Sequence, residues 1–284
     1  MSLGLSIPPG GSSTHFELSA RYAYGSLALG MELQKVRQKM QVETTKRDII
    51  RMASHHIGLS FMSNKRRKTA GTGSLLASEC RRILSLLEGR PIAEHDIAKD
   101  ENGRPYFQDH HSDFSISHSG NMCAVSLVND KNMRTGCDIQ LVRPGVKIGD
   151  IAEKFFWPVE RKYIFQGDEK RLGEERFFHI WTLKESYIKL LGHSVFGMPK
   201  VPSFVGDGYM EHFSFNGDSS LSFYLYDISG SCERYMLAAA VKGEEAARPE
   251  IHWFSQPEAP FLPCRIIAVI KAGLSPAEMM IPKM

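Results

Sequence analysis

Two short segments hold the residues whose types and spacing are best suited to catalysis. The first, Trp181 to Lys189, lies within Glu174–Leu191, where apolar residues repeat with helical periodicity. There Glu185 and Lys189 lie one helical turn apart, so their side chains point the same way. The second segment is Gly136 to Gln140, in which Asp138 stands at the end of a short apolar strand. Acids from a strand and a helix, with a lysine beside one of them, can hold a divalent metal against a phosphate. The pattern therefore indicates phosphate chemistry.

Each segment alone also has a simpler interpretation. Glu185 and Lys189 suit an exposed ion pair of about 0.2–0.5 kcal/mol, and Asp138 suits a turn. Further unusual segments nevertheless follow one another in a fixed order along the chain. They are Lys65-Arg66-Arg67-Lys68-Thr69, Asn102-Gly103-Arg104-Pro105-Tyr106, Asp113-Phe114-Ser115-Ile116-Ser117-His118-Ser119-Gly120, Gly136-Cys137-Asp138-Ile139-Gln140, Phe155-Phe156-Trp157-Pro158-Val159-Glu160 and Trp181-Thr182-Leu183-Lys184-Glu185.

Together these segments resemble the large, surfactin-synthetase-activating type of 4′-phosphopantetheinyl transferase, from about Lys65 to Val241. The resemblance implies an enzyme that transfers the 4′-phosphopantetheine arm of coenzyme A to a serine of an apo acyl or peptidyl carrier protein. Such an enzyme uses Mg²⁺ and releases adenosine 3′,5′-bisphosphate. The resemblance also implies an α+β fold, in which two similar α/β halves with small antiparallel sheets are related by a pseudo-twofold axis. The active site then lies between the halves.

The resemblance assigns the metal to Asp138 and Glu185. Gln140 stands where many family members have a second acid, and its neutral amide oxygen is expected to bind Mg²⁺ weakly or through water. Glu185 also suits the base that accepts the serine proton. Glu160 is the rival base, and its alternative role is an acid in the first turn of a helix, where the helix dipole favours it.

The residues expected at coenzyme A combine charged, hydroxyl and turn-forming types. They are Lys68, Thr69, Gly103, Arg104, Pro105, Ser117, His118, Lys184 and Lys189, and the expected catalytic set is Asp138, Glu185, Lys189 and His118. By resemblance, Lys189 and Lys184 bind the pyrophosphate as point charges, and His118 donates to the same phosphate. A histidine satisfied by its own neighbours is the alternative for His118.

The other coenzyme A contacts are expected in two segments nearer the N-terminus. By resemblance, Lys68 and Thr69 meet the ribose 3′-phosphate, and the loop 103–105 lies against adenine, where glycine permits close approach. Arg104 is expected to be free to reach a phosphate. The alternatives are a solvated basic helix start for the first segment and a plain surface turn for the second.

The composition narrows the classes of protein. A formal net charge of +3 over 284 residues is too slight for a nucleic-acid-binding protein. Apolar runs fall short of the roughly 18 residues needed to span a bilayer, and the first residues lack the pattern of a signal peptide. The 5 cysteines are scattered, without a Cys-x-x-Cys pair. We therefore expect a cytoplasmic enzyme with reduced thiols and neither membrane nor nucleic acid as a partner.

The chain is expected to divide into a flexible leader (1–14), an N-terminal half (15–131), a C-terminal half (132–256) and a tail of unassigned role (257–284). Because both halves lie in one chain, a monomer suffices to build the site. Strands are expected at Phe114–Ser117, Met122–Val128, Arg134–Ile139, Leu221–Asp227 and Tyr235–Val241, and helices at Ser74–Leu87, Gly149–Phe156, Pro158–Phe165 and Glu174–Leu191. The loop Asn129–Asn132 is predicted to be a hairpin whose returning strand presents Asp138.

The resemblance places carrier docking on Leu141–Phe156, where Arg143, Lys147 and Lys154 would steer an acidic partner. Two alternative functions are weighed against the transferase. A catalytically silent relative would bind coenzyme A or a carrier without transfer, and Gln140 is its only support. A nucleic-acid-binding module would need exposed aromatic residues among the basic ones, which the sequence lacks.

Overall fold

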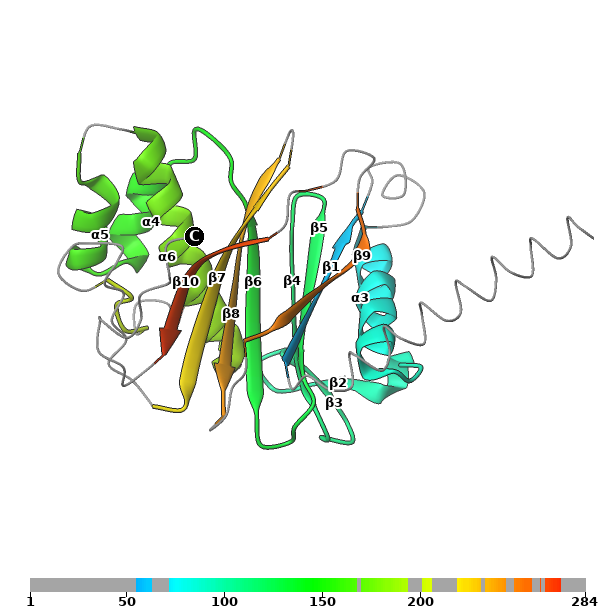
Figure 1. Ribbon diagram of the computed structural model, residues 1–284. Helices are drawn as coiled ribbons and strands as arrows, with labels where there is room; N and C mark the ends of the chain where they lie inside the picture. Colours follow the sequence, from blue (N-terminus) through cyan, green and yellow to red (C-terminus); the bar gives the residue numbers. More distant parts are fainter. Residues whose placement is uncertain are drawn as a thin grey trace, which may run out of the picture. The chain divides into compact units, whose positions relative to one another are not determined.

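The helices and strands of the middle part of the chain follow the sequence patterns closely. The computed structural model describes residues 55–62, 72–167, 170–193, 201–205, 219–230, 233–243, 248–256, 261 and 264–271 (Figure 1). Contacts between residues divide the chain into Met1–Ile49 and Ile50–Met284, and every described residue belongs to the second unit. The expected leader and the basic segment Lys65–Thr69 lie outside the described residues.

One four-stranded sheet contains a strand that is buried along its whole length. The order of strands is β4 (Asp113–Ser119), β5 (Met122–Val128), β1 (His55–Phe61) and β9 (Glu250–Ser255). β5 is antiparallel to both β4 and β1, whereas β9 runs parallel to β1. Every residue of β5 is buried because apolar clusters cover both of its faces.

The second four-stranded sheet is antiparallel throughout. The order of strands is β10 (Arg265–Lys271), β7 (Leu221–Ser229), β8 (Arg234–Lys242) and β6 (Arg134–Leu141). Part of the unassigned tail therefore forms strand β10, and Asp138 lies on the strand at the opposite end of the sheet. The α+β class with two small sheets is confirmed. The pseudo-twofold relation between halves and the predicted boundaries stay predictions.

The prediction of a hairpin across Asn129–Asn132 is wrong. Strands β5 and β6 flank this loop but belong to different sheets. β5 is already paired with β4 on one side and β1 on the other, so it offers no edge to the next strand. β6 pairs with β8 instead, and Asp138 lies opposite Ala238. Apolar alternation shows which faces of a strand are buried, but it does not select the neighbouring strand.

Four helices complete the described fold around these sheets (Figure 1). They are α3 (Thr72–Glu88), α4 (Ile148–Phe155), α5 (Pro158–Phe165) and α6 (Lys170–Leu191). α3 packs on the first sheet, α6 packs on β6 and β8, and α4 and α5 pack against α6. The four predicted helices are confirmed to within four residues at each end. In the described part of the chain, no helix is long and apolar enough to span a membrane.

α6 lies very close to β6 because Gly136 has no side chain. A Cβ atom on this glycine would overlap the carbonyl oxygen of Ser186 and the amide nitrogen of Leu190. Both atoms belong to the helix backbone, so rotation of a side chain cannot make room for the Cβ. The close approach brings the helix face that carries Lys189 to the strand that carries Asp138.

Gly136→Ala is expected to destabilise the protein by about 2–4 kcal/mol, because α6 must move away from β6. Gly149→Ala is the matched control: Gly149 lies in α4, and a Cβ there meets nothing within 4 Å. The control change is expected to be neutral or slightly stabilising, because alanine favours the helix. Urea unfolding of both variants measures the difference. Equal free energies of unfolding would contradict the close packing of α6 on Gly136.

Candidate active site

Asp138 is the centre of a cluster drawn from β4, β6 and α6. The residue is 2% exposed. Oδ1 accepts hydrogen bonds from Lys189 Nζ (2.7 Å) and Ser117 Oγ (2.8 Å), and Oδ2 accepts one from Gln140 Nε2 (2.8 Å). Lys189 Nζ also lies 2.8 Å from Ser117 Oγ. The structure therefore brings together four of the residues that the sequence selected.

Glu185 lies one helical turn before Lys189 and is partly buried. The pKa of Glu185 is raised to about 7, first by burial and then by the negative charge of Asp138, against the opposing effect of Lys189. Burial alone would lower the pKa of Lys189, but Asp138 is foremost among the groups that raise it above its ordinary value. The carboxyl groups of Asp138 and Glu185, which repel each other, thus both lie near the protonated ammonium group of Lys189.

Side chains of β4, rather than its backbone, accept hydrogen bonds from the backbone of β6. Four N–H groups of β6 donate to four side chains of β4 with one constant offset. These bonds are Thr135 N to Asp113 Oδ2 (2.8 Å), Cys137 N to Ser115 Oγ (3.0 Å), Ile139 N to Ser117 Oγ (3.2 Å) and Leu141 N to Ser119 Oγ (3.0 Å). We call this contact the β4–β6 seam. Its sequence signal is a serine at every second position of β4.

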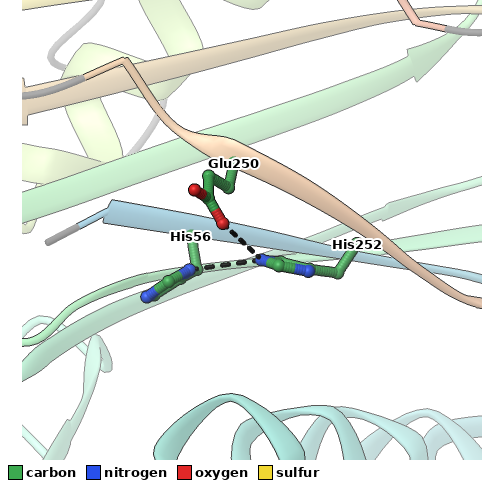
Figure 2. A group of neighbouring side chains, drawn as sticks. All are labelled: His56, Glu250 and His252. Atoms are coloured by element: carbon green, nitrogen blue, oxygen red, sulfur yellow. Dashed lines mark hydrogen bonds and ion pairs between the residues drawn. The ribbon is translucent and has the colours of Figure 1, made fainter. Parts of the chain in front are cut away.

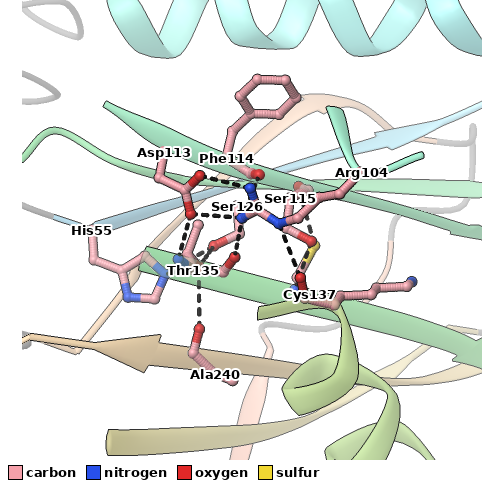
Figure 3. A network of polar contacts seen from close by, with 10 residues as sticks. His55, Arg104, Asp113, Phe114, Ser115, Ser126, Thr135, Cys137 and Ala240 are labelled. Carbon is pink, nitrogen blue, oxygen red and sulfur yellow. Dashed lines mark hydrogen bonds and ion pairs between the residues drawn. The ribbon is translucent and has the colours of Figure 1, made fainter. Parts of the chain in front are cut away.

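Arg104 ties the end of α6 to both sheets (Figure 3). Its guanidinium donates to both carboxylate oxygens of Asp113, at 2.9 and 2.7 Å. It also donates to the carbonyl oxygens of Lys189 (3.0 Å), Phe114 (3.3 Å) and Thr135 (3.1 Å). Sequence reasoning expected Arg104 to be free to reach a phosphate. Most of its five N–H donors are instead taken by protein acceptors.

A buried polar chain continues from Thr135 into the first sheet (Figure 3). Thr135 Oγ1 lies 2.6 Å from Ser126 Oγ, which lies 2.9 Å from His55 Nε2. Thr135 also donates to the carbonyl oxygen of Ala240, at 3.2 Å. The chain of contacts links β6 to β5, β1 and β8, and it satisfies groups that burial would otherwise penalise. Sequence reasoning missed these residues, because a single hydroxyl or imidazole inside an apolar strand carries no distinct pattern.

A pocket of about 200 Å³ shares Lys189 with the Asp138 cluster. Its lining includes Gly103, Arg104, Pro105, Ser115, Ile116 and Lys189. Gly103 has φ +83° in the turn between β2 (Ile97–Lys99) and β3 (Pro105–Phe107), a conformation that glycine adopts without strain. The loop 103–105 and Lys189 therefore line one pocket. The resemblance sets this loop against adenine and this lysine against pyrophosphate.

α6 ends beside this pocket in a Schellman motif. Gly192 has φ +73°, His193 N donates to Ile188 O (3.0 Å), and Gly192 N donates to Lys189 O (3.2 Å). The same carbonyl oxygen of Lys189 accepts the bond from Arg104. The helix end that carries Lys189 is therefore fixed by its own cap and by a side chain from the β2–β3 turn.

Of three other predicted residues, one lies on the opposite face of β4 from Ser117 and two lie outside the described residues. His118 is exposed on β4, and because side chains alternate along a strand it points to the opposite face from Ser117. Lys68 and Thr69 lie outside the described residues. The roles of all three stay predictions.

Lys184 and Glu160 form an ion pair between α6 and α5 in which both side chains are 0% exposed, with Nζ 3.0 Å from Oε2. Glu160 also accepts hydrogen bonds from Trp157 N (2.9 Å) and Phe204 N (3.3 Å), which caps the start of α5. Burial raises the pKa of Glu160 and lowers that of Lys184, against the charge of the partner in each case. Lys184 is one residue from Glu185, about 100° around the helix, and so faces away from it.

Comparison with known proteins bears on the region that holds the cluster. Residues 134–239 match the model of the 4′-phosphopantetheinyl transferase superfamily. The chain is 30% identical over 142 residues to the 4′-phosphopantetheinyl transferase HetI of Nostoc sp., which covers 48% of this chain and 55% of that protein. It is 38% identical over 97 residues to a 4′-phosphopantetheinyl transferase of Bacillus subtilis, which covers 32% of this chain and 39% of that protein.

The part of the chain that matches the 4′-phosphopantetheinyl transferase superfamily is residues 134–239. This superfamily region begins at β6 and ends within β8, and it contains Asp138, Gln140, Glu185 and Lys189. The serines of the seam and the pocket loop precede it in sequence. The chain spans about half the length of HetI and less of the Bacillus subtilis transferase. The resemblance drawn from the motifs is confirmed for the superfamily.

Lys184→Met is expected to destabilise the protein by about 3–5 kcal/mol, because it leaves the charge of Glu160 buried without a partner. Adding Glu160→Gln should restore part of the loss, since the amide oxygen can still accept from Trp157 N and no buried charge remains. Lys162→Met, on the exposed face of α5, is the control. Urea unfolding of the single and double variants measures the coupling. Unchanged stability with weaker binding of coenzyme A would instead assign Lys184 to a phosphate.

Proposed function

We propose that the chain transfers the 4′-phosphopantetheine arm of coenzyme A to a serine of an apo acyl or peptidyl carrier protein. The observation that carries this proposal is the gathering of Asp138, Glu185 and Lys189 beside the pocket lined by residues 103–105. In this reaction the serine oxygen bonds to the phosphorus nearest the pantetheine. The bond from that phosphorus to the oxygen of adenosine 3′,5′-bisphosphate breaks, and this nucleotide leaves.

The Asp138 cluster has the donors that a magnesium ion requires. Asp138 and Glu185 offer carboxylate oxygens, the ligand type that Mg²⁺ prefers. The charge of Asp138 raises the pKa of Glu185, so the two acids repel each other and a divalent cation between them would be stabilising. Bound Mg²⁺ would neutralise charge on the pyrophosphate. Gln140 can add a weak amide oxygen, although its nitrogen now faces Asp138.

Lys189 is the best-placed residue for the pyrophosphate. Its ammonium is protonated, is held by Asp138 and lines the pocket at the end of α6. The loop 103–105 forms the same pocket and can lie against adenine, with the backbone rather than the Arg104 side chain available. Lys184 is not assigned to the pyrophosphate, because its side chain is buried in an ion pair with Glu160.

Glu185 suits the role of base better than Glu160 does. Glu185 is partly exposed, and with a pKa of about 7 a substantial fraction of it is ionised near neutral pH. Glu160 is fully buried, paired with Lys184 and engaged in capping α5. We therefore assign the serine proton to the carboxylate of Glu185.

The loop before α4 and α4 itself form the proposed docking surface for the carrier. Arg143, Lys147 and Lys154 are exposed along it and would steer an acidic carrier toward the cluster. Phe155 and Phe156 instead pack in the apolar cluster beneath α4. Arg143, Lys147 and Lys154 thus remain available to contact the carrier protein.

Asp138→Asn and Glu185→Gln are each expected to lower the rate of transfer by roughly 100-fold or more, because each removes a carboxylate from the cluster. Transfer is read by mass spectrometry of apo acyl and peptidyl carriers incubated with coenzyme A and Mg²⁺. Glu94→Gln is the matched control, since the Glu94 side chain is 89% exposed. Thermal unfolding shows that each variant is folded. No added mass on any carrier with the parent protein would favour the catalytically silent relative.

Gln140→Glu is expected to lower the Mg²⁺ concentration for half-maximal transfer by roughly 3- to 10-fold, because a third carboxylate raises the negative charge of the cluster. The variant also loses the amide donor to Asp138 Oδ2. The measurement is the rate of transfer over a series of Mg²⁺ concentrations at fixed coenzyme A. A requirement that stays the same or rises would contradict a metal contact at this position.

A further inference from the structure

Two histidines and a glutamate meet where the parallel strand β9 joins β1, outside the Asp138 cluster. Figure 2 shows Glu250 and His252 from β9 and His56 from β1 converging on one another. His56 Nδ1 lies 3.2 Å from His252 Nε2, and His252 Nε2 lies 3.8 Å from Glu250 Oε2. One ligand atom from each of the three residues lies within 4.8 Å of the other two.

The register of the two strands explains this convergence. His56 is the partner of Glu250 across the parallel pair, and Gly58 is the partner of His252. Residues two apart on a strand share a face, so both β9 side chains stand on the same face as His56. Gly58 has no side chain, and none therefore stands between His252 and His56 on β1. The imidazole of His252 can lean across to His56 for this reason.

Two of the three separations between the ligand atoms are close to those of a tetrahedral zinc site. With Zn–N and Zn–O distances of about 2.0–2.2 Å, neighbouring ligand atoms of a tetrahedron lie about 3.3–3.6 Å apart. The observed 3.2 and 3.8 Å bracket this range. His56 is buried, whereas the Glu250 side chain is 46% exposed, so the site opens to solvent on the glutamate side. A water molecule can complete the coordination there.

The donor set selects a different class of metal from the one proposed at Asp138. Imidazole nitrogens suit zinc and its transition-metal neighbours, whereas magnesium prefers oxygen donors alone. Two imidazoles and one carboxylate are a common protein set for Zn²⁺. The contact also joins positions 196 residues apart, at the one parallel pair of strands among the described residues.

We propose that His56, Glu250 and His252 form a site for a divalent transition-metal ion such as Zn²⁺, which fastens β9 to β1. The site is independent of the transfer reaction, so its test needs no carrier protein and no coenzyme A. Metal bound by the folded chain alone stabilises that state by mass action, and the midpoint of thermal unfolding must rise with zinc concentration.

The first experiment measures zinc binding to the full chain after removal of metals with a chelator. Calorimetric titration with Zn²⁺ is expected to show one ion per chain and a rise of several degrees in the midpoint of thermal unfolding. Co²⁺ is expected to bind the same site with the strong visible absorption of a four-coordinate ion. Mg²⁺ should neither displace Co²⁺ nor change this absorption. Absence of stoichiometric zinc binding would overturn the proposal.

Variants then test whether these three residues hold the ion. His252→Gln is expected to abolish the cobalt absorption, and Glu250→Gln to weaken zinc binding by about 10-fold or more. His95→Gln is the matched control, because the His95 side chain is 86% exposed and lies in the short 3₁₀ helix Glu94–Asp96. Should His252→Gln fail to fold, the exposed Glu250→Gln variant still decides the question. Zinc binding equal to the parent protein in Glu250→Gln and His252→Gln would place the ion elsewhere and overturn the proposal.

Discussion

The fold depends on the β4–β6 seam, where side chains of one strand satisfy the backbone of the other. A buried N–H without an acceptor costs about 1–3 kcal/mol, and apolar residues in place of Asp113 and the alternate serines would leave several such groups. Ser117 shows how closely the seam and the site are connected. Its hydroxyl accepts from Ile139 N and Lys189 Nζ and donates to Asp138 Oδ1, so its one donor and two acceptor positions are all used. Ser117 therefore takes part in the β4–β6 seam and also orients Asp138 and Lys189.

α6 is the second element that positions the site, and three independent contacts fix it. The absent side chain of Gly136 lets the helix backbone lie against β6. Arg104 holds the carbonyl oxygen of Lys189 near the helix end, and the buried pair of Lys184 with Glu160 attaches its outer side to α5. Charges fixed in this way need little rearrangement during a reaction, which is the condition under which electrostatic catalysis is most effective. The contacts that pack α6 against its neighbours therefore also hold its charged residues in place at the site.

Local patterns in the sequence predicted the helices and the cluster, and they failed where the outcome depends on distant partners. Helical periodicity found 174–191 and placed its acid and lysine one turn apart, which the structure bears out. The pairing of the strand after 129–132 depends on which edge is free, and no local pattern records that. Arg104 and Lys184 looked available for phosphates because a sequence shows charges but not the acids that bind them in the fold. The local elements and the residues that they bring together were therefore predictable further than the distant partners of single residues were.

The parallel pairing of β9 with β1 has a consequence for how the chain matures on the ribosome. His56 and His252 are separated by 196 residues, so at about 5–20 residues per second roughly 10–40 s pass between their synthesis. Once β5 has been made and has paired with β1, the other edge of β1 stays unpaired until β9 follows, and such an edge is the kind of surface that recruits other strands or a chaperone. Closure of the first sheet by β9 is therefore a late event in the synthesis of the chain.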